Sequence, residues 1–278
     1  MATSERDVLD DLLDELLDLA AAAAAEAGRL LLDRPADLDV GTKSTPTDVV
    51  TVMDRRSERL HVDRILAARP DDGFLGEEGS DSTGTSGVRW VLDPVDGTVN
   101  YLYDQPVWSV SVAAELDGEV VVGVVEVPRL RETYTAVRGR GARRNGQPIR
   151  VSSCGELPSA LVATGFGYDA GERARQATTL VEVLPRVRDI RRYGAASVDL
   201  CAVACGRVDA YYERGLHPWD LAAGGLVARE AGARVEGLHG EPASEALVLA
   251  AGPGVFDAVH DLLAPLRPDL GPPDDGSG

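Results

Sequence analysis

The sequence predicts a layered α/β fold with mixed and antiparallel sheets, and three observations support this. Segments with apolar residues at helical spacing alternate with short apolar runs typical of strands. Residues 107–151 have the pattern of an antiparallel meander, because turn pairs separate runs of β-branched residues. From about residue 161 a second set of strands and helices follows. We therefore expect one domain of two contiguous α/β layers, roughly 1–151 and 152–267.

Two helices are expected near the start of the chain. The first covers about residues 7–32, where leucines recur at helical spacing opposite a row of aspartates. We interpret this acidic row as a solvated face. The second helix covers about residues 54–68 and follows the extended segment 49–52.

Strands and turns dominate the middle of the chain. The run 109–114 turns at Asp117-Gly118 into the run 120–125, and a third strand lies near 132–137. Asn145-Gly146 is a strong turn signal. These residues are interpreted as structural.

The second layer is expected to hold strands and helices in alternation, without a linker or repeat before it. The expected elements are a strand near Leu161, helices at about 173–183 and 196–205, a strand at 208–212 and a helix after Asp220. Residues 268–278, rich in proline, glycine and aspartate, are expected to form a disordered tail.

Composition is typical of a soluble enzyme. The 278-residue chain has a formal net charge of -18, which disfavours nucleic acid as a partner because phosphate backbones need a basic surface. No run of eighteen apolar residues and no signal-peptide pattern is found, so we expect a cytoplasmic protein that makes no membrane contact. Cys154, Cys201 and Cys205 are interpreted as buried thiols.

The strongest functional signal is the motif D-P-V-D-G-T at residues 93–98, which directly follows the apolar run 88–92. That run predicts a buried strand, so Asp93 should leave it at the carboxyl end, where layered α/β folds bind their ligands. Gly97 and Thr98 offer backbone N–H groups that can open a short helix and contact an anion. Asp-Pro and Asp-Gly are also ordinary turn pairs, so the motif needs support from elsewhere.

Other acidic segments provide this support. The pair Glu77-Glu78 follows a short apolar strand, and a threonine-rich segment leads from Lys43, the only lysine, to Asp54 at the start of a helix. Asp220 follows a proline at a position that suits the first turn of a helix. Carboxylate ligands without a histidine or cysteine cluster favour a hard ion, Mg²⁺, with Mn²⁺ as the alternative.

In this order, the motifs G-E-E, D-P-x-D-G-T and W-D-x-x-A resemble those of the inositol monophosphatase family of Mg²⁺-dependent, lithium-sensitive phosphatases. The resemblance covers roughly residues 5–265. It implies a layered αβαβα sandwich of the inositol monophosphatase and fructose-1,6-bisphosphatase type. It also implies two or three Mg²⁺ ions, a small phosphate ester as substrate, and a homodimer.

The resemblance also implies a metal ligand set. Glu77, Asp93 and the Val95 carbonyl resemble the ligands of the first metal, and Asp93, Asp96 and Asp220 resemble those of the second. Divalent ions neutralise a phosphate monoester and lower the pKa of a coordinated water. Without metal, such clustered carboxylates should repel one another and bind protons, so metal binding and local order should be coupled.

Catalytic and substrate contacts are implied in the same way. Asp54 and Thr98 resemble the pair that orients the attacking water, with Glu77 as a further catalytic residue. The segment 193–197 resembles the stretch that contacts the polyol, and Glu213 resembles the acceptor for inositol hydroxyls. The implied substrate-binding residues are Gly97, Thr98, Gly194, Ala196 and Glu213.

These contacts favour myo-inositol monophosphate as the substrate, because its leaving group is neutral and rich in hydroxyls. A nucleotide would bring a second phosphate and need a basic pocket. Fructose-1,6-bisphosphate, histidinol phosphate and a 3'-phosphonucleotide are the alternatives among enzymes. A regulatory protein that acts through partner contacts is the alternative outside the enzyme class.

For three residues near the acidic motifs, the sequence leaves two interpretations open. Lys43 either pairs with a carboxylate near the metals or is an ordinary exposed lysine, and Glu78 either faces the ion or does not. His217 either orients the loop before Asp220 or is structural. Asn100 is expected to support the turn after Thr98. Trp219, by its size, is expected to pack in the core beneath the site, and Asp48 to lie at a strand edge or behind the metal ligands.

Overall fold

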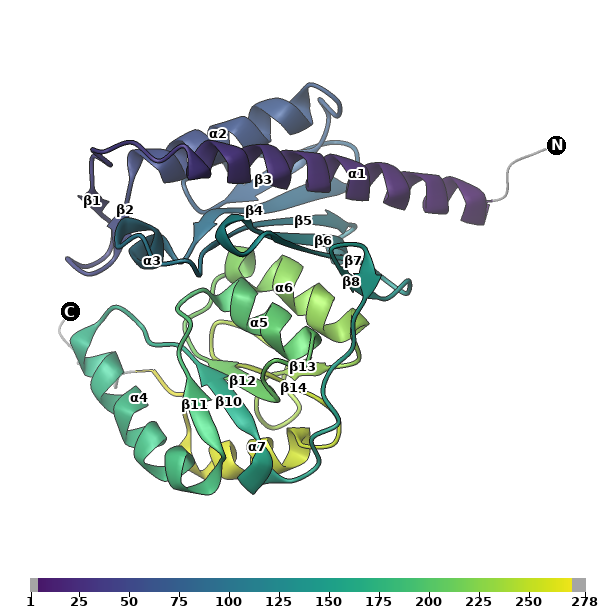
Figure 1. Cartoon of the computed structure of the whole chain (residues 1–278). Helices are drawn as coiled ribbons and strands as arrows, with labels where there is room; N and C mark the ends of the chain where they lie inside the picture. Colours follow the sequence, from purple (N-terminus) through teal and green to yellow (C-terminus); the bar gives the residue numbers. More distant parts are fainter. Residues whose placement is uncertain (1–4, 272–278) are drawn as a thin grey trace, which may run out of the picture.

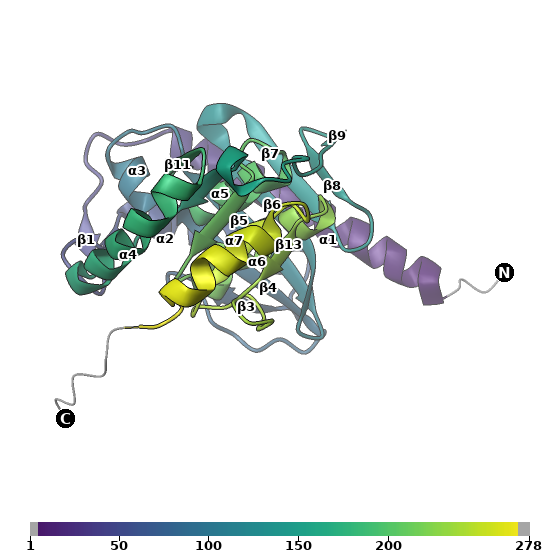
Figure 2. The same ribbon diagram turned by 90° about the horizontal axis from the view of Figure 1, so that it is seen from below.

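The computed structural model describes residues 5–271 and confirms the layered α/β prediction. The layers follow one another in the order αβαβα (Figure 1). Helices α1 (Glu5–Leu32) and α2 (Val52–Leu66) cover the outer face of the first sheet. Helices α5 (Ala196–Ala204) and α6 (Pro218–Glu230) lie between the two sheets. Helices α4 (Ala170–Val183) and α7 (Phe256–Leu263) cover the outer face of the second sheet, as Figure 2 shows from below.

The first sheet contains the predicted meander. Its strands are β3 (Gly73–Gly76), β4 (Val88–Asp96), β5 (Ser109–Leu116), β6 (Glu119–Val127), β7 (Glu132–Val137), β8 (Ala142–Arg144) and β9 (Gln147–Pro148), and they lie in chain order. Only the β3–β4 pair is parallel, and all later pairs are antiparallel. The short helix α3 (Thr98–Leu102) follows β4 at the edge that carries the acidic motif.

The second sheet is mixed. Its strands are β10 (Leu161–Thr164), β11 (Asp189–Arg191), β12 (Ala210–Glu213), β13 (Arg234–Glu236) and β14 (Val248–Ala251), in the spatial order β11-β10-β12-β14-β13. The first three strands in this order are parallel. Strand β14 is antiparallel to both of its neighbours, β12 and β13, so β13 runs in the same direction as the first three. A separate two-stranded ladder joins β1 (Gly41–Thr42) to β2 (Val49–Val50). Short 3₁₀ turns lie at Pro128–Leu130, Leu157–Ser159, Leu184–Arg186 and Ala264–Leu266.

A continuous apolar core joins the two sheets through α5 and α6. It includes Val91 and Ala113 of the first sheet and Tyr211 of the second, all fully buried. Gly123 on β6 allows α6 to approach closely, because a Cβ there would lie 2.8 Å from the carbonyl oxygen of Ala223. The start of α6 is thereby held firmly against the first sheet.

Some element boundaries differ from the sequence prediction. Strand β4 does not end before Asp93 but continues to Asp96, with its pairing to β5 shifted between these residues. Pro94 explains the shift, because it has no N–H for the ladder. Helix α2 begins at Val52 rather than Asp54, since Thr51 caps it. Strands β11, β13 and β14 and helix α7 were not predicted.

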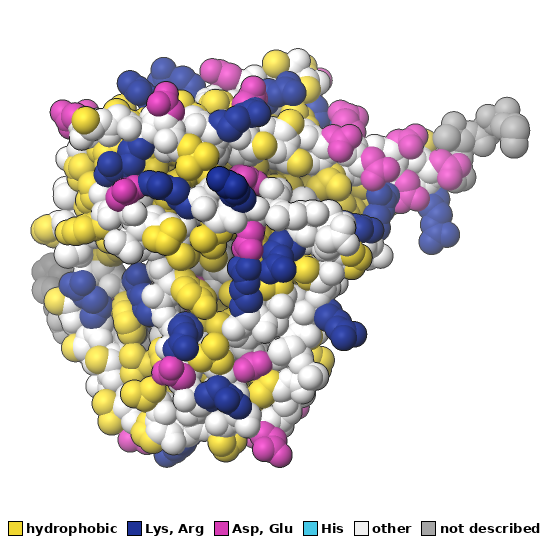
Figure 3. All heavy atoms as spheres, viewed as in Figure 1, with side chains coloured by type: hydrophobic (Ala, Val, Ile, Leu, Met, Phe, Trp, Pro, Cys, Tyr) yellow, Lys and Arg dark blue, Asp and Glu magenta, His cyan; other side chains and the backbone are white. Residues whose placement is uncertain are grey.

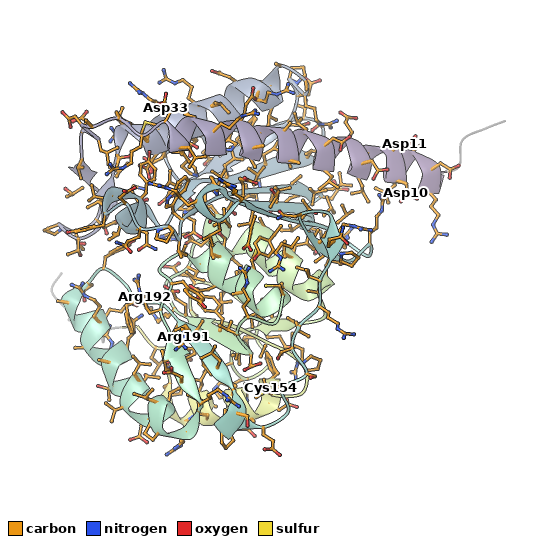
Figure 4. The ribbon with its side chains drawn as sticks, viewed as in Figure 1. Asp10, Asp11, Asp33, Cys154, Arg191 and Arg192 are labelled. Carbon is orange, nitrogen blue, oxygen red and sulfur yellow. The ribbon has the colours of Figure 1, made fainter. Side chains whose placement is uncertain are left out.

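The acidic row near the N-terminus lies on the exposed side of α1, as predicted. The first turns of this helix extend beyond the body of the protein, and acidic side chains cover them in Figure 3. Asp10, which Figure 4 labels together with Asp11, pairs with Arg140, and so does Asp14. Within residues 5–271, no helix is both long and apolar enough to cross a membrane.

The predicted tail lies partly outside the described residues, which end at Gly271. Its first residues make contacts in the structure. Asp269 forms an ion pair with Arg267 at 2.9 Å, and its carbonyl accepts a hydrogen bond from Arg214 Nε at 3.4 Å.

Candidate active site

A cavity of about 390 Å³ opens between the two layers, where β3 and β4 end and where α3, α5 and α6 begin. We call it the acidic cleft. All the predicted metal ligands and substrate contacts line it: Glu77, Asp93, Val95, Asp96, Gly97, Thr98, Gly194, Ala196, Glu213 and Asp220. Among the predicted site residues, Asp54 alone does not line the cleft and reaches it through Thr98.

Three carboxylates meet at the floor of the acidic cleft. Oxygen atoms of Asp93, Asp96 and Asp220 all lie within 4.8 Å of one another. Asp93 and Asp96 come from the irregular end of β4, and both are buried. Asp220 lies in the first turn of α6, where its Oδ2 accepts a hydrogen bond from the His217 N–H at 2.7 Å. The capping position therefore fixes Asp220 beside two residues that lie more than a hundred positions earlier.

Asp96 also binds the start of α5. Its Oδ1 accepts from the Ala196 N–H at 3.1 Å, and its Oδ2 accepts from the N–H and hydroxyl of Ser197 at 2.7 and 2.6 Å. A carboxylate is stabilised at a helix N-terminus by these free N–H groups and by the helix dipole. Asp96 thus connects the two layers at the site. The sequence analysis included Ser197 in the 193–197 segment but did not predict its contact with Asp96.

The Glu77 and Glu78 carboxylates share Lys43. Its Nζ lies 2.8 Å from Glu77 Oε1 and 2.5 Å from Glu78 Oε1. Burial lowers the pKa of Lys43, but the charge of Glu77 and hydrogen bonds to both carboxylates outweigh it and raise this pKa above its ordinary value. Of the two interpretations of Lys43, the structure therefore supports the one in which it pairs near the acidic cluster.

Thr98 and Asp54 form a hydrogen-bonded pair next to the cluster. Thr98 Oγ1 lies 3.0 Å from Asp54 Oδ1 and 3.0 Å from the Val95 carbonyl oxygen, so its proton can go to either acceptor. Asp54 Oδ2 in turn accepts from the N–H and hydroxyl of Thr51 at 2.8 and 2.6 Å. The cap of α2 therefore holds Asp54 rigidly, and Asp54 orients the Thr98 hydroxyl.

Gly97 makes the turn between β4 and α3 in the left-handed region, with φ at 87°. A Cβ at this position would also lie 3.0 Å from the Gly194 carbonyl oxygen and 3.1 Å from the Ala195 Cβ. Only glycine meets both requirements without strain. The turn brings the acidic motif against the 193–197 segment. Asn100 supports it as predicted, since its Nδ2 donates to the Val107 and Tyr193 carbonyls at 2.6 and 2.7 Å.

Glu213 lies at the end of β12, on the wall opposite the N-terminal layer. Its Oε2 accepts a hydrogen bond from the Tyr211 hydroxyl at 2.6 Å. Burial raises the pKa of Glu213 to about 7, although the Tyr211 hydrogen bond and the charge of Arg192 lower it. A Cβ at Gly165 would lie 1.9 Å from Glu213 Oε2, so any other residue there would displace the Glu213 carboxylate.

Other predicted residues lie near the cleft with smaller roles. Trp219 packs against the apolar core as expected, but it is only half-buried and also lines the cleft, with its ring 4.9 Å from that of His217. His217 orients Asp220 through its main chain. Asp48 Oδ2 accepts from the Ser44 N–H at 3.1 Å and holds the loop that carries Lys43.

The sequence analysis did not identify two arginines on the cleft wall. Arg214 pairs with Glu172 at 2.6 Å. Arg192, which Figure 4 places on the second layer facing the gap between the layers, lies with its guanidinium 5.9 Å from the Phe166 ring. The Arg-Arg pair before the 193–197 segment was the available signal.

The charges of the cluster fit a divalent cation. Burial raises the pKa of Asp93 well above its ordinary value, and the neighbouring charges of Glu77 and Asp96 add to this effect. Burial raises the pKa of Asp220 in the same way. Within residues 5–271, no lysine or arginine forms an ion pair with Asp93, Asp96 or Asp220. Buried carboxylates need such compensation, and an all-oxygen donor set suits Mg²⁺.

A pH-dependent stability should follow in metal-free protein. Because the folded pKa values of Asp93 and Asp220 are raised, the folded state binds more protons than the unfolded state above about pH 4, so the free energy of unfolding should fall as pH rises. Denaturant unfolding in EDTA between pH 4 and 8 measures this. Asp93→Asn should be more stable than wild type at pH 8 and show a smaller fall. An identical pH dependence in both proteins would contradict the charge argument.

Comparison with known proteins gives a consistent result. The model of the inositol monophosphatase family matches residues 12–270. The chain is 44% identical to the inositol-1-monophosphatase SuhB of Mycobacterium tuberculosis over 94% of this chain and 93% of that one. It is 38% identical to the Nus factor SuhB of Escherichia coli over 81% of this chain and 86% of that one. The crystal structure of the extragenic suppressor protein suhB from Bartonella henselae aligns with a TM-score of 0.85 at 35% identity, covering 90% and 98% of the two chains.

Proposed function

This chain belongs to the inositol monophosphatase family of phosphoric monoester hydrolases, and we propose that it hydrolyses myo-inositol monophosphate to inositol and phosphate with Mg²⁺ as its cofactor. The observation that carries the proposal is the cluster of buried Asp93 and Asp96 with half-buried Asp220, in a cleft that is also lined by Thr98, which bonds Asp54, and by Glu213. This arrangement provides a place for metal, nucleophile and polyol in one cleft.

Two metal positions are proposed. Glu77, Asp93 and the Val95 carbonyl would hold the first ion, and Asp93, Asp96 and Asp220 the second. Bound Mg²⁺ would supply positive charge at the phosphate and make water a better nucleophile. Glu77 would have to give up its contact with Lys43 at least in part, which leaves the ammonium paired with Glu78.

The protein's own contribution to the chemical step is the positioning of water and phosphate. The Thr98 hydroxyl, held by Asp54, can accept a hydrogen bond from water and pass its own proton toward Asp54. The backbone of Gly97 and Thr98 at the start of α3 is proposed to contact the phosphate. Thr51 holds Asp54 in place, and the turn at Gly97 fixes the start of α3. The Thr98 hydroxyl and the backbone N–H groups therefore need little reorganisation during the reaction.

The polyol is proposed to lie between Glu213 and the Gly194–Ala196 backbone. Glu213 accepts one hydrogen bond from Tyr211 and has capacity left for substrate hydroxyls. The Ala196 N–H already donates to Asp96, so it is not available to the substrate. Ala196 would therefore contact the polyol by van der Waals contact. Pre-formed groups of this kind select a hydroxyl-rich leaving group.

A substrate panel tests the proposal. Phosphate release is measured from inositol monophosphate, fructose-1,6-bisphosphate, histidinol phosphate and a 3'-phosphonucleotide in the presence of Mg²⁺. We expect the highest kcat/KM for inositol monophosphate. A preference for another ester would overturn the substrate assignment. No release from any ester would favour a partner-binding role. The Escherichia coli relative is named a Nus factor, which is consistent with such a role.

Lithium should inhibit the reaction. The family is lithium-sensitive, and the second proposed metal position offers only carboxylate oxygens, from Asp93, Asp96 and Asp220. A small monovalent ion can occupy such ligands without supplying enough charge for turnover. Initial rates in increasing lithium chloride should fall, whereas equal concentrations of sodium chloride should leave them unchanged. Equal rates in both salts would contradict the assignment of this position.

Glu213→Gln should separate the two substrate classes. Glutamine removes the charge that receives the polyol hydroxyls, so kcat/KM for inositol monophosphate should fall about 10-fold to about 100-fold, the scale of a charged hydrogen bond. Hydrolysis of p-nitrophenyl phosphate should change little, because that ester has no hydroxyls to bind. Glu182→Gln, on exposed α4, is the matched control. Equal losses on both esters would place Glu213 in a structural role instead.

Two further expectations remain proposals. A homodimer is expected from family membership and agrees with two-fold assemblies being the commonest oligomers. A cytoplasmic location remains a prediction from the sequence.

A further inference from the structure

A second cavity, of about 400 Å³, lies on the far side of Glu213 from the acidic cleft. We call it the side cavity. It is lined by α4, the end of β12 and the segment that follows α7. Helix α7 itself lies beside α4 on the outer face of the second sheet (Figure 2). Phe166, Glu172, Glu213 and Arg214 line both cavities, so the two are neighbours that share a wall. The catalytic proposal makes no use of the side cavity.

The lining of the side cavity is mainly apolar. Its apolar surface comes from segments far apart in sequence, with Phe166 before α4, Tyr212 on β12, Leu247 before β14, and Leu266 and Leu270 beyond α7. Its volume falls in the range that small organic ligands occupy, about 300–1,000 Å³. An apolar space of this size favours an apolar ligand, because filling it removes hydrocarbon surface from water.

Most charged groups around the side cavity are already paired. Arg214 Nη1 lies 2.6 Å from Glu172, and Glu182 lies 3.1 Å from Arg186. Arg267 pairs with Asp269, which is outside the lining. Glu213, on the wall shared with the acidic cleft, forms no ion pair within residues 5–271, and its carboxylate accepts the Tyr211 hydroxyl.

Arg175 is the cation of the described lining that has no ion-pair partner. It lines the side cavity from α4, and its Nη2 is buried without a hydrogen-bond partner. No ion pair or hydrogen bond to this guanidinium is found within residues 5–271. The Arg175 charge influences Asp169, but that carboxylate caps α4 by accepting the Glu172 N–H at 2.9 Å. A buried donor that is both charged and unpaired is costly, and an anionic ligand group would satisfy it.

We propose that the side cavity is a binding site for a small apolar molecule that carries one anionic group, such as a carboxylate or sulfonate, which pairs with Arg175. The apolar part of the ligand contacts the aromatic and leucine side chains of the wall. The site is distinct from the polyol position, because Glu213 and the Glu172–Arg214 pair separate the two cavities. This inference does not depend on which ester the acidic cleft hydrolyses.

Matched fluorescent probes test the proposal. 8-Anilinonaphthalene-1-sulfonate has an aromatic body and one sulfonate, whereas N-phenyl-1-naphthylamine has the same body without the charge. Each is titrated into the full-length protein. We expect saturable one-to-one binding of the sulfonate probe, with weaker binding of the neutral probe.

Two arginine variants locate the anion. Arg175→Gln should weaken the sulfonate probe about tenfold or more, the scale of a charged hydrogen bond, and leave the neutral probe within about twofold. Arg173→Gln is the control, because this exposed residue lies on the same helix outside the lining. Sulfonate binding that is unchanged in Arg175→Gln, or that falls equally in Arg173→Gln, would overturn the proposal. Absence of saturable one-to-one binding to wild type would also overturn it.

Discussion

Replacing Asp93 by asparagine is expected to lower kcat/KM for inositol monophosphate by about 10³-fold or more. Asp93 is the residue proposed to contact both metal positions, and it lies buried within 4.8 Å of the oxygens of Asp96 and Asp220. Asparagine keeps the shape but removes the charge. A loss of about 4 kcal/mol of transition-state charge stabilisation corresponds to about 10³-fold in rate.

The fold should survive this substitution, since burial and repulsion make the Asp93 charge unfavourable without metal. Circular dichroism and the unfolding midpoint in EDTA check that point. Asp261→Asn, on the exposed face of α7, is the control for simple loss of a negative charge and should keep full activity. Activity of Asp93→Asn within tenfold of wild type would contradict the proposed metal site.

Replacing Thr98 by valine is expected to lower kcat by about 10²-fold or more, the usual scale for loss of a positioned acid–base group. Valine keeps the branched shape at the start of α3 but removes the hydroxyl that lies 3.0 Å from Asp54 Oδ1. The KM should change little, because the metal ligands and the polyol contacts remain. Steady-state kinetics with saturating Mg²⁺ separate the two parameters.

Thr133→Val is the matched control for Thr98→Val. The Thr133 hydroxyl also donates to a carboxylate, Glu126 Oε2 at 2.5 Å, but it lies on β7 and does not line the acidic cleft. This variant should keep kcat within a few-fold of wild type. If both variants lost activity to the same extent, or if Thr98→Val raised KM alone, Thr98 would not be the residue that positions water.

The layered fold was predictable because periodicity and turn pairs are local properties. Asp117-Gly118 and Asn145-Gly146 form turns where expected, and both Asp117 and Asn145 have positive φ. The misses occur where local signals are weak. The packing that buries β13 and β14 depends on contacts between segments distant in sequence. Strand β4 also extends beyond Pro94, because its pairing with β5 resumes at Asp96 after the shift.

Much of the candidate site was also predictable, since the proposed metal ligands belong to short motifs at element ends. The motifs could not show that Asp96 binds the start of α5, because residues 96 and 196 are brought together only by the packing of the two layers. They also could not show that Lys43 shares the Glu77 and Glu78 carboxylates. Such contacts join segments distant in sequence, so no local sequence pattern predicts them.

Calorimetric titration of Mg²⁺ into wild type and Asp93→Asn tests the central claim most directly. The cluster of Asp93, Asp96 and Asp220 predicts saturable binding to wild type. At about 100 times the Kd, binding should add about 2.7 kcal/mol to the free energy of unfolding and so raise the Tm by several degrees. The variant should bind far more weakly and show no such rise. Equal Mg²⁺ binding by both proteins, or none by wild type, would contradict the account.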